Sequence, residues 1–193
     1  LPVFRKSRIE AYAGQMAQLC RRTRDEWSDG AEIDMADAMM HLTMLIASQA
    51  LFEHDIGDET RKVSANIDAV LDFFTRLSSP FLKLYLALPF PAGLRFKKAV
   101  RELDAVIYRM IDKRRRTGVS GNDLLSLLMQ ARDDETHAQM TEKQLRDEVL
   151  TLLIAGHETT ANVLAWTFYL LALDPVAEAR LHAEATSVLG GRE

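Results

Sequence analysis

Residues that could do chemistry gather in one short cluster, Ala155-Gly156-His157-Glu158-Thr159-Thr160. The cluster lies between two strongly apolar runs, residues 149–155 and 163–171, in a segment with helical periodicity. A glycine inside a helix costs about 1 kcal/mol relative to alanine, and a buried, unpaired glutamate costs more. Polar residues at such a place conflict with the surrounding pattern, and conflicts of this kind tend to mark functional sites.

Helical spacing distributes the cluster over different faces. One face carries small and polar residues three and four positions apart, which stack along a helix: Ala155, Gly156, Thr159 and Val163. Its small residues make this face flat enough for a planar ligand to lie against it. The Thr159 hydroxyl can donate to the Ala155 carbonyl, which would loosen the helix locally. Glu158 is about 100° from Thr159 around the axis, so it addresses another surface.

A long helix is predicted to carry the cluster. Thr141-Glu142-Lys143-Gln144 has the form of a capping box, with Thr141 at the N-cap and Gln144 at the third helical position. The helical pattern continues to Asp174, where Pro175 prevents continuation. At about 1.5 Å per residue this helix spans roughly 50 Å, the width of a mid-sized domain. We therefore expect it to run through the centre of the protein.

The rest of the chain is also predicted to be helical, and alternating β-type patterns are nearly absent. Predicted helices cover residues 7–27, 34–53, 59–77, 94–116 and 122–131, and Asp34 is the expected N-cap of the second. A polar surface loop is predicted at residues 133–137. Residues 80–95 are apolar but contain three prolines, which argues against a continuous helix. This segment either packs as a lid or lines a ligand entrance. The predicted fold class of the chain is all-α.

Composition limits the possible functions. The chain has 193 residues, of which 48% are hydrophobic and 27% charged, and a net charge of -4. These values fit one soluble globular domain, of which residues 1–193 form a part, and they offer no nucleic-acid surface. The basic run at residues 113–116 is interpreted as a solvated helix end. Cys20 is the only cysteine, so an internal disulfide is impossible, and a reducing, cytoplasmic location is expected.

The cluster and its setting resemble the cytochrome P450 family. The pattern Ala155-Gly156-x-Glu158-Thr159-Thr160, in the middle of a long apolar helix, is similar to the oxygen-binding helix of that family. The resemblance extends over essentially the whole chain and includes residues 1–4, 88–116, 122–128, 146–148 and 174–191. It implies that the chain is the helical portion of a mixed, mainly α fold that is built around one long central helix.

The same resemblance implies a haem-thiolate monooxygenase that activates dioxygen and hydroxylates a small apolar substrate. Thr159 matches the alcohol that hydrogen-bonds to oxygen and organises water, and Glu158 matches the acid that relays protons through water. The positions that match the haem-binding face are Ala155, Gly156, Thr159 and Thr160. The implied cofactor is haem b, with electrons from NAD(P)H through a ferredoxin or flavin reductase. His157 falls at a variable position and receives no catalytic role.

The sequence also departs from the family pattern. The family's iron ligand is a cysteine thiolate in a Phe-x-x-Gly-x-x-x-Cys-x-Gly loop, and this sequence contains no such loop. No glutamate is followed three residues later by arginine, so the family's Glu-x-x-Arg pair is missing as well. Cys20 lies in a charged helical context. We therefore expect no metal ligand in these residues and no activity from the chain by itself.

Several alternatives remain open. The chain could be a helical ligand-binding or regulatory bundle without catalysis, or a bundle that binds haem through His157. The cluster could also be an ordinary buried helix with satisfied polar groups. Residues 149–173 are long enough to span a membrane, although they would place a carboxylate near the bilayer centre. A zinc hydrolase is a further interpretation, but its pattern needs a second histidine where Ala161 stands.

Overall fold

The computed structural model describes residues 6–52, 59–76, 90–118, 123–133 and 135–190. Within these ranges the chain forms α-helices and no strand, apart from one isolated antiparallel bridge between Arg132 and Gln139. The helices are α1 (Lys6–Asp25), α2 (Met35–Phe52), α3 (Thr60–Arg76), α5 (Pro91–Thr117), α6 (Leu124–Gln130), α7 (Glu142–Leu173) and α8 (Pro175–Leu189). The predicted all-α class is confirmed.

Local sequence signals fix where most of these helices begin. The Asp34 carboxylate accepts hydrogen bonds from the backbone N–H groups of Ala36 and Asp37, at 3.0 and 3.1 Å, and so caps α2 as predicted. Helix α5 begins at Pro91, slightly before the predicted start, because proline has a helical φ and needs no N–H partner at the first position. Residues 91–95 are therefore helical, which corrects part of the expectation for residues 80–95. Residues 77–89 lie outside the described residues.

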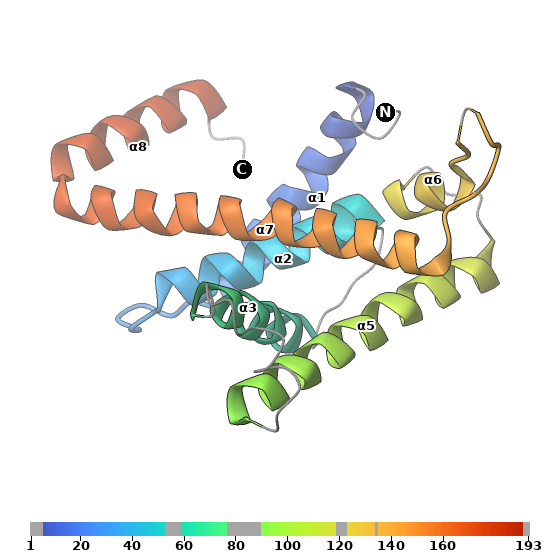
Figure 1. Ribbon diagram of the computed structural model, residues 1–193. Helices are drawn as coiled ribbons and strands as arrows, with labels where there is room; N and C mark the ends of the chain where they lie inside the picture. Colours follow the sequence, from blue (N-terminus) through green and yellow to red (C-terminus); the bar gives the residue numbers. More distant parts are fainter. Residues whose placement is uncertain (1–5, 53–58, 77–89, 119–122, 134, 191–193) are drawn as a thin grey trace.

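Helix α7 is the longest element, with 32 residues. Both bonds of the predicted capping box are present: Thr141 Oγ1 accepts from the Gln144 N–H at 3.2 Å, and Gln144 Oε1 accepts from the Thr141 N–H at 2.9 Å. Figure 1 shows α7 crossing the whole molecule, as expected for a central helix. The α-helix continues through residues 155–160, so the polar cluster interrupts the apolar composition and not the helix.

Helix α8 was not predicted as a separate helix. Pro175 ends α7 but also begins α8, because the Asp174 carboxylate accepts hydrogen bonds from the N–H groups of Val176 and Ala177, each at 3.1 Å. An aspartate N-cap followed by proline at the first helical position is a strong start signal. In Figure 1, α8 folds back alongside the end of α7.

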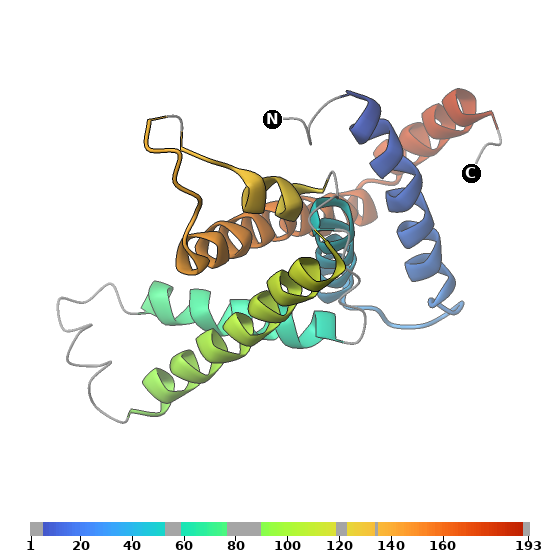
Figure 2. The same ribbon diagram turned by 90° about the vertical axis from the view of Figure 1, so that its right-hand side faces the viewer.

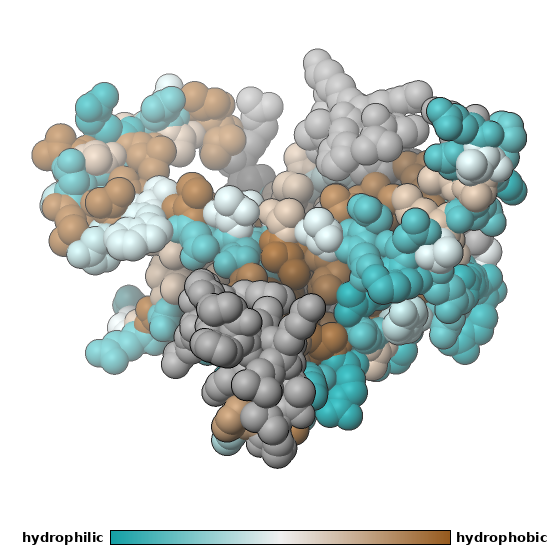
Figure 3. Space-filling view, in the orientation of Figure 1, coloured by the Kyte–Doolittle hydropathy of each residue, from teal (hydrophilic) through white to brown (hydrophobic). Residues whose placement is uncertain are grey.

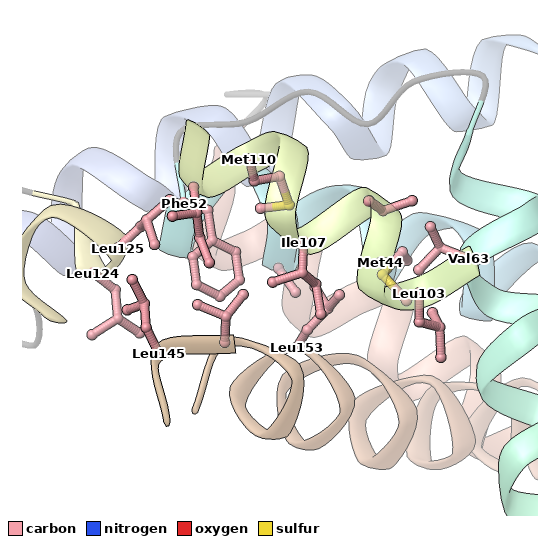
Figure 4. Close-up of a cluster of buried hydrophobic side chains, with 14 of the residues drawn as sticks. Met44, Phe52, Val63, Leu103, Ile107, Met110, Leu124, Leu125, Leu145 and Leu153 are labelled. Carbon is pink, nitrogen blue, oxygen red and sulfur yellow. The ribbon is translucent and has the colours of Figure 1, made fainter. Parts of the chain in front are cut away.

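The main core lies where α2, α3, α5 and α6 cover the first half of α7. Figures 1 and 2 agree that α3 and α5 lie side by side. Figure 4 shows side chains from all five helices meeting in one cluster: Met44, Phe52, Val63, Leu103, Ile107, Met110, Leu124, Leu125, Leu145 and Leu153. Each large apolar side chain buried in this way stabilises the fold by about 1.5–3 kcal/mol. A smaller cluster of Met39, Leu42 and Ala161 joins α2 to α7 further along.

The basic run at the end of α5 is only partly a solvated helix end. Arg115 is exposed and pairs with Glu142 at 2.6 Å, as a surface residue does. The interpretation is wrong for Arg114, whose side chain is only 16% exposed and lies 3.2 Å from the fully buried Asp123. The physical reason is tertiary: the start of α6 packs against the end of α5 and needs a cation there.

None of the helices within the described ranges is both long and apolar enough to cross a membrane. The polar cluster in the centre of α7 reduces the hydropathy of the longest candidate. This finding argues against the membrane-spanning interpretation of residues 149–173.

Candidate functional site

At the polar cluster, α7 has a buried side and an exposed side. The buried side is formed by Leu153, His157 and Ala161, which repeat every four residues and are each 1 or 2% exposed. It packs toward α2, because Ala161 shares a cluster with Met39 and Leu42 of that helix. His157 thus lies between Leu153, which belongs to the main core, and Ala161, which belongs to the smaller cluster. The imidazole ring of His157 therefore separates the two apolar clusters.

The exposed side carries the predicted flat face. Ala155, Gly156 and Thr159 are exposed, and Val163 and Trp166 continue the face with 62% and 64% exposure. Thr159 is two residues after His157, about 200° around the axis, so the two side chains point in nearly opposite directions. Ala155, Gly156, Thr159 and Val163 therefore share one face of α7, as helical spacing predicted. His157 lies on the opposite side.

Three side chains in the cluster bond to carbonyl groups of their own helix. Thr159 Oγ1 donates to the Ala155 carbonyl at 3.3 Å, as predicted, and Thr160 Oγ1 donates to the Gly156 carbonyl at 3.4 Å. His157 Nδ1 lies 2.9 Å from the Leu153 carbonyl oxygen. In an α-helix each of these carbonyls also accepts the backbone N–H four residues later. The side-chain bonds compete with that ladder and weaken it.

Glu158 is the free acid of the cluster. Its side chain is partly exposed and pairs with none of the residues that the structure describes. It stands about 100° around the helix from Thr159, on the edge between the buried and exposed sides. A carboxylate in this position can exchange protons with water while the neighbouring hydroxyl faces the flat surface.

Asp68 of α3 lies within electrostatic range of His157. Partial desolvation raises the pKa of Asp68, whereas His157 in its protonated form lowers that pKa and Asp37 raises it. Desolvation is the largest of these effects, so the neighbourhood disfavours the charged carboxylate in spite of the imidazole.

The exposed face suits a flat, largely apolar ligand. Ala155 and Gly156 have small side chains that project little from the helix. Thr159 and Thr160 provide uncharged hydroxyl groups. Figure 3 shows that hydrophobic side chains remain exposed over α8 and the end of α7, and these include Leu173, Val176, Leu181 and Val188. This donor set and shape fit the face of a haem, for which the sequence predicted Ala155, Gly156, Thr159 and Thr160.

The described residues bring no cluster of histidine, cysteine and carboxylate side chains together that could hold a metal ion. Cys20 is exposed on α1. His157 is buried on the side of α7 away from the flat face, and its Nδ1 is engaged by a backbone carbonyl. This placement argues against both the zinc-hydrolase interpretation and an axial role of His157 toward a haem on the exposed face.

A hollow further along α7, which none of residues 155–160 lines, was not foreseen from the sequence. A cavity of about 650 Å³ lies between the end of α7 and α8, with residues such as Phe168, Leu171 and Leu181 in its walls. Its walls are almost entirely apolar, although Glu178 and His182 reach it. The exposed apolar residues of α8 were a signal for such a surface, but only once α8 is recognised as a helix.

Comparison with known proteins adds a decisive observation. The sequence model of the family described as "Cytochrome P450" matches residues 3–193. The chain belongs to the cytochrome P450 family. The predicted resemblance is thus confirmed over nearly the entire P450 chain, including its polar cluster and its first helices.

Several curated proteins are similar to this P450 chain. It is 38% identical to "Cyclooctatin synthase" of Streptomyces melanosporofaciens, over 99% of the chain and 42% of that protein. It is 31% identical to "Pentalenene oxygenase" of Streptomyces avermitilis, over 98% of the chain and 42% of that protein. A "Bifunctional cytochrome P450/NADPH--P450 reductase" of Gibberella moniliformis is 27% identical over 98% of the chain and 18% of that protein. The chain therefore spans less than half the length of these relatives.

Solved P450 structures share the fold. The crystal structure of a cytochrome P450 (CYP102L1) superposes with a TM-score of 0.81 and 25% sequence identity, covering 100% of this chain and 45% of that one. The helices described above therefore match the helical portion of the P450 fold, as expected from the sequence.

Proposed function

We propose that this P450 chain is the oxygen-activating helical part of a haem-thiolate monooxygenase that hydroxylates an apolar substrate. One observation carries the proposal: Thr159 lies on an exposed, flat face of the central helix, with the free carboxylate of Glu158 beside it. Residues 1–193 would then be part of a single domain, and the chain alone would be inactive.

Haem b, when bound, would supply the one-electron and dioxygen chemistry. Ala155, Gly156, Thr159 and Thr160 would lie against its face and leave room beside it. The Thr159 hydroxyl makes only a long bond to the Ala155 carbonyl, 3.3 Å, so it can exchange that bond for one to oxygen or water. Glu158 would pass protons to it through water as a general acid.

The iron ligand and the electron source are further parts of the proposal. The thiolate would come from residues outside this chain, because Cys20 is an exposed residue of α1, on another helix from the flat face. Electrons from NAD(P)H would arrive through a ferredoxin or flavin reductase. The relative whose name joins a P450 with an NADPH–P450 reductase supports this type of supply. A cytoplasmic location, predicted from the sequence, belongs to the same proposal.

The substrate class follows from the relatives and from the exposed surface. Two of the relatives reported above are named for cyclooctatin and pentalenene. The region that continues the flat face is apolar, with Val163 and Trp166 exposed. We propose an apolar cyclic terpenoid, for which apolar contacts would supply most of the binding free energy.

The test is Thr159→Ala in the whole haem-loaded protein, compared with Thr167→Ala. Thr167 is a matched control, since it is exposed on the same helix and its hydroxyl also bonds four residues back, at 2.7 Å. We expect Thr159→Ala to release more peroxide per NAD(P)H consumed and to form about 100-fold less product, at the lower end of the range that a positioned proton-transfer group contributes. Thr167→Ala should leave both quantities unchanged.

Both variants should retain the ferrous–carbon monoxide absorption band of a thiolate-ligated haem. Unchanged coupling in Thr159→Ala would remove Thr159 from the mechanism. A wild-type protein that binds apolar ligands but never gives the thiolate band would instead support a ligand-binding bundle without catalysis.

A further inference from the structure

His157 holds an unusual place in α7. It is 1% exposed, between two apolar clusters, and its Nδ1 lies 2.9 Å from the carbonyl oxygen of Leu153. A carbonyl oxygen only accepts, so Nδ1 must carry the proton. The donor is therefore fixed by geometry, and a buried apolar residue such as leucine would fill this position without any hydrogen bond.

The bond from His157 is one of three that act on a single turn of the helix. The carbonyls of Leu153, Ala155 and Gly156 accept side-chain bonds from residues 157, 159 and 160. The two threonine bonds, at 3.3 and 3.4 Å, lie on exposed side chains, whereas the shorter histidine bond is buried. Water can replace the exposed bonds but not the buried one. Of the three side-chain bonds, the one from His157 is therefore the one that water does not replace, and it competes with the backbone hydrogen bond to the Leu153 carbonyl.

We propose that His157 is a positioning residue, which loosens α7 from the side of α2 and so sets where the backbone and hydroxyl of Thr159 stand on the opposite face. Only one helical turn connects the bond of His157 to those of Thr159 and Thr160. Leu153 accepts from His157, and the next carbonyls toward the flat face are those that Thr159 and Thr160 engage. The catalytic part of this inference rests on the proposed function, but the loosening of the helix does not.

Two variants separate the hydrogen bond from the packing. His157→Leu keeps an apolar side chain of similar size and removes the donor, while His157→Asn keeps an N–H donor near the position of Nδ1. Thr43→Val is the matched control, because Thr43 of α2 makes the same kind of buried bond, 2.8 Å to the Met39 carbonyl four residues earlier. All three are compared in the whole haem-loaded protein.

The first readout is amide hydrogen exchange of residues 157–160, which does not depend on turnover. His157→Leu should slow this exchange about three- to tenfold, as expected when a bond of ordinary strength no longer competes with the ladder. His157→Asn should not slow it, and Thr43→Val should leave it as in the wild type. The second readout is the ratio of peroxide to product, which should rise in His157→Leu and return toward the wild-type value in His157→Asn.

The outcomes are distinct. If His157→Leu and Thr43→Val change only the melting temperature, the inference is overturned while the proposed function stands. If the wild type shows no thiolate band, the proposed function fails, and the exchange data still decide the local claim. The ¹⁵N spectrum of the unaltered protein gives an answer even where His157→Leu does not fold. A protonated Nδ1 supports the inference, and a histidine protonated only at Nε2 contradicts it.

Discussion

Asp123, at the start of α6, and His157, in the middle of α7, are both fully buried polar residues, but their surroundings differ. Asp123 receives hydrogen bonds from the backbone and hydroxyl of Ser126, at 3.1 and 2.6 Å, and an ion pair from Arg114 at 3.2 Å. Arg114 also donates to the Phe52 carbonyl at 3.1 Å. At Asp123 the carboxylate accepts from the N–H of Ser126, a first-turn donor of α6 that has no partner within its own helix. The Leu153 carbonyl that His157 engages is, in contrast, already an acceptor in the ladder of α7.

This difference separates two uses of buried polarity. At Asp123 the side chain supplies a missing cap and neutralises a cation, so it joins the ends of α2, α5 and α6. At His157 the side chain shares a carbonyl with a backbone bond, and we infer that this competition loosens the helix. Full compensation is what structural buried charges require. Incomplete or competing compensation, in a helix that faces a candidate site, is the pattern expected where function restrains stability.

The largest effect should come from breaking the compensated site. Asp123→Asn keeps the cap acceptor but removes the charge that pairs with Arg114, and we expect it to lower the free energy of unfolding by about 3 kcal/mol. Ser126→Ala should cost only about 1 kcal/mol, because it removes one hydroxyl donor. Urea unfolding of the two variants measures the difference. Equal, small losses would mean that the ion pair is not important for stability.

A smaller and opposite effect is expected in the polar cluster. Gly156→Ala should raise the free energy of unfolding of the haem-free protein by about 1 kcal/mol, because alanine is a better helix former. Its methyl group would stand on the flat face, so the fraction of protein that retains haem should fall. Gly14→Ala is the matched control, since Gly14 lies exposed in α1 with nothing within 4 Å of an added Cβ. It should give the same gain with unchanged haem retention. If Gly156→Ala also leaves haem retention unchanged, the flat face is not where the macrocycle lies.

The smallest expected effect on stability concerns His41 of α2, a histidine whose buried nitrogen, Nδ1, has no hydrogen-bond partner among the described residues. Burial, and then Arg61, lowers its pKa from the ordinary value of 6.5. The folded protein therefore binds this proton less well than the unfolded chain, so stability is complete above pH 6.5 and falls as the pH drops below it. The melting temperature should drop more between about pH 7.5 and pH 5.5 in the wild type than in His41→Gln. The exposed His182 provides the control, His182→Gln, and equal slopes in all three proteins would contradict this account.

Much of the fold could be predicted because its signals are local. The capping box at Thr141, the cap at Asp34 and the apolar periodicity of α7 depend only on nearby residues. The flat face followed from helical spacing alone, since Ala155 and Thr159 must share a side of any helix. These parts of the prediction needed no knowledge of the neighbouring helices.

The remaining features depend on contacts between distant segments. Arg114 resembles its exposed neighbour Arg115 in the sequence, and only the approach of α6 makes it part of a buried pair. His157 lies at a variable position of the family pattern, and its burial follows from the packing of α2 against α7. The repeat Leu153, His157, Ala161 was visible in the sequence, but spacing alone does not tell which side of a central helix meets another helix.

The junction of α7 and α8 has one more consequence. Asp174 is both the last cap of α7 and the first cap of α8, so no linker residue separates the two helices. With no further residue between the helices to take up a change in angle, we expect a rotation of α7 about its axis to displace α8 as well. Small movements near Thr159 would therefore be felt as displacements at the far end of α8, beyond the reach of any direct contact.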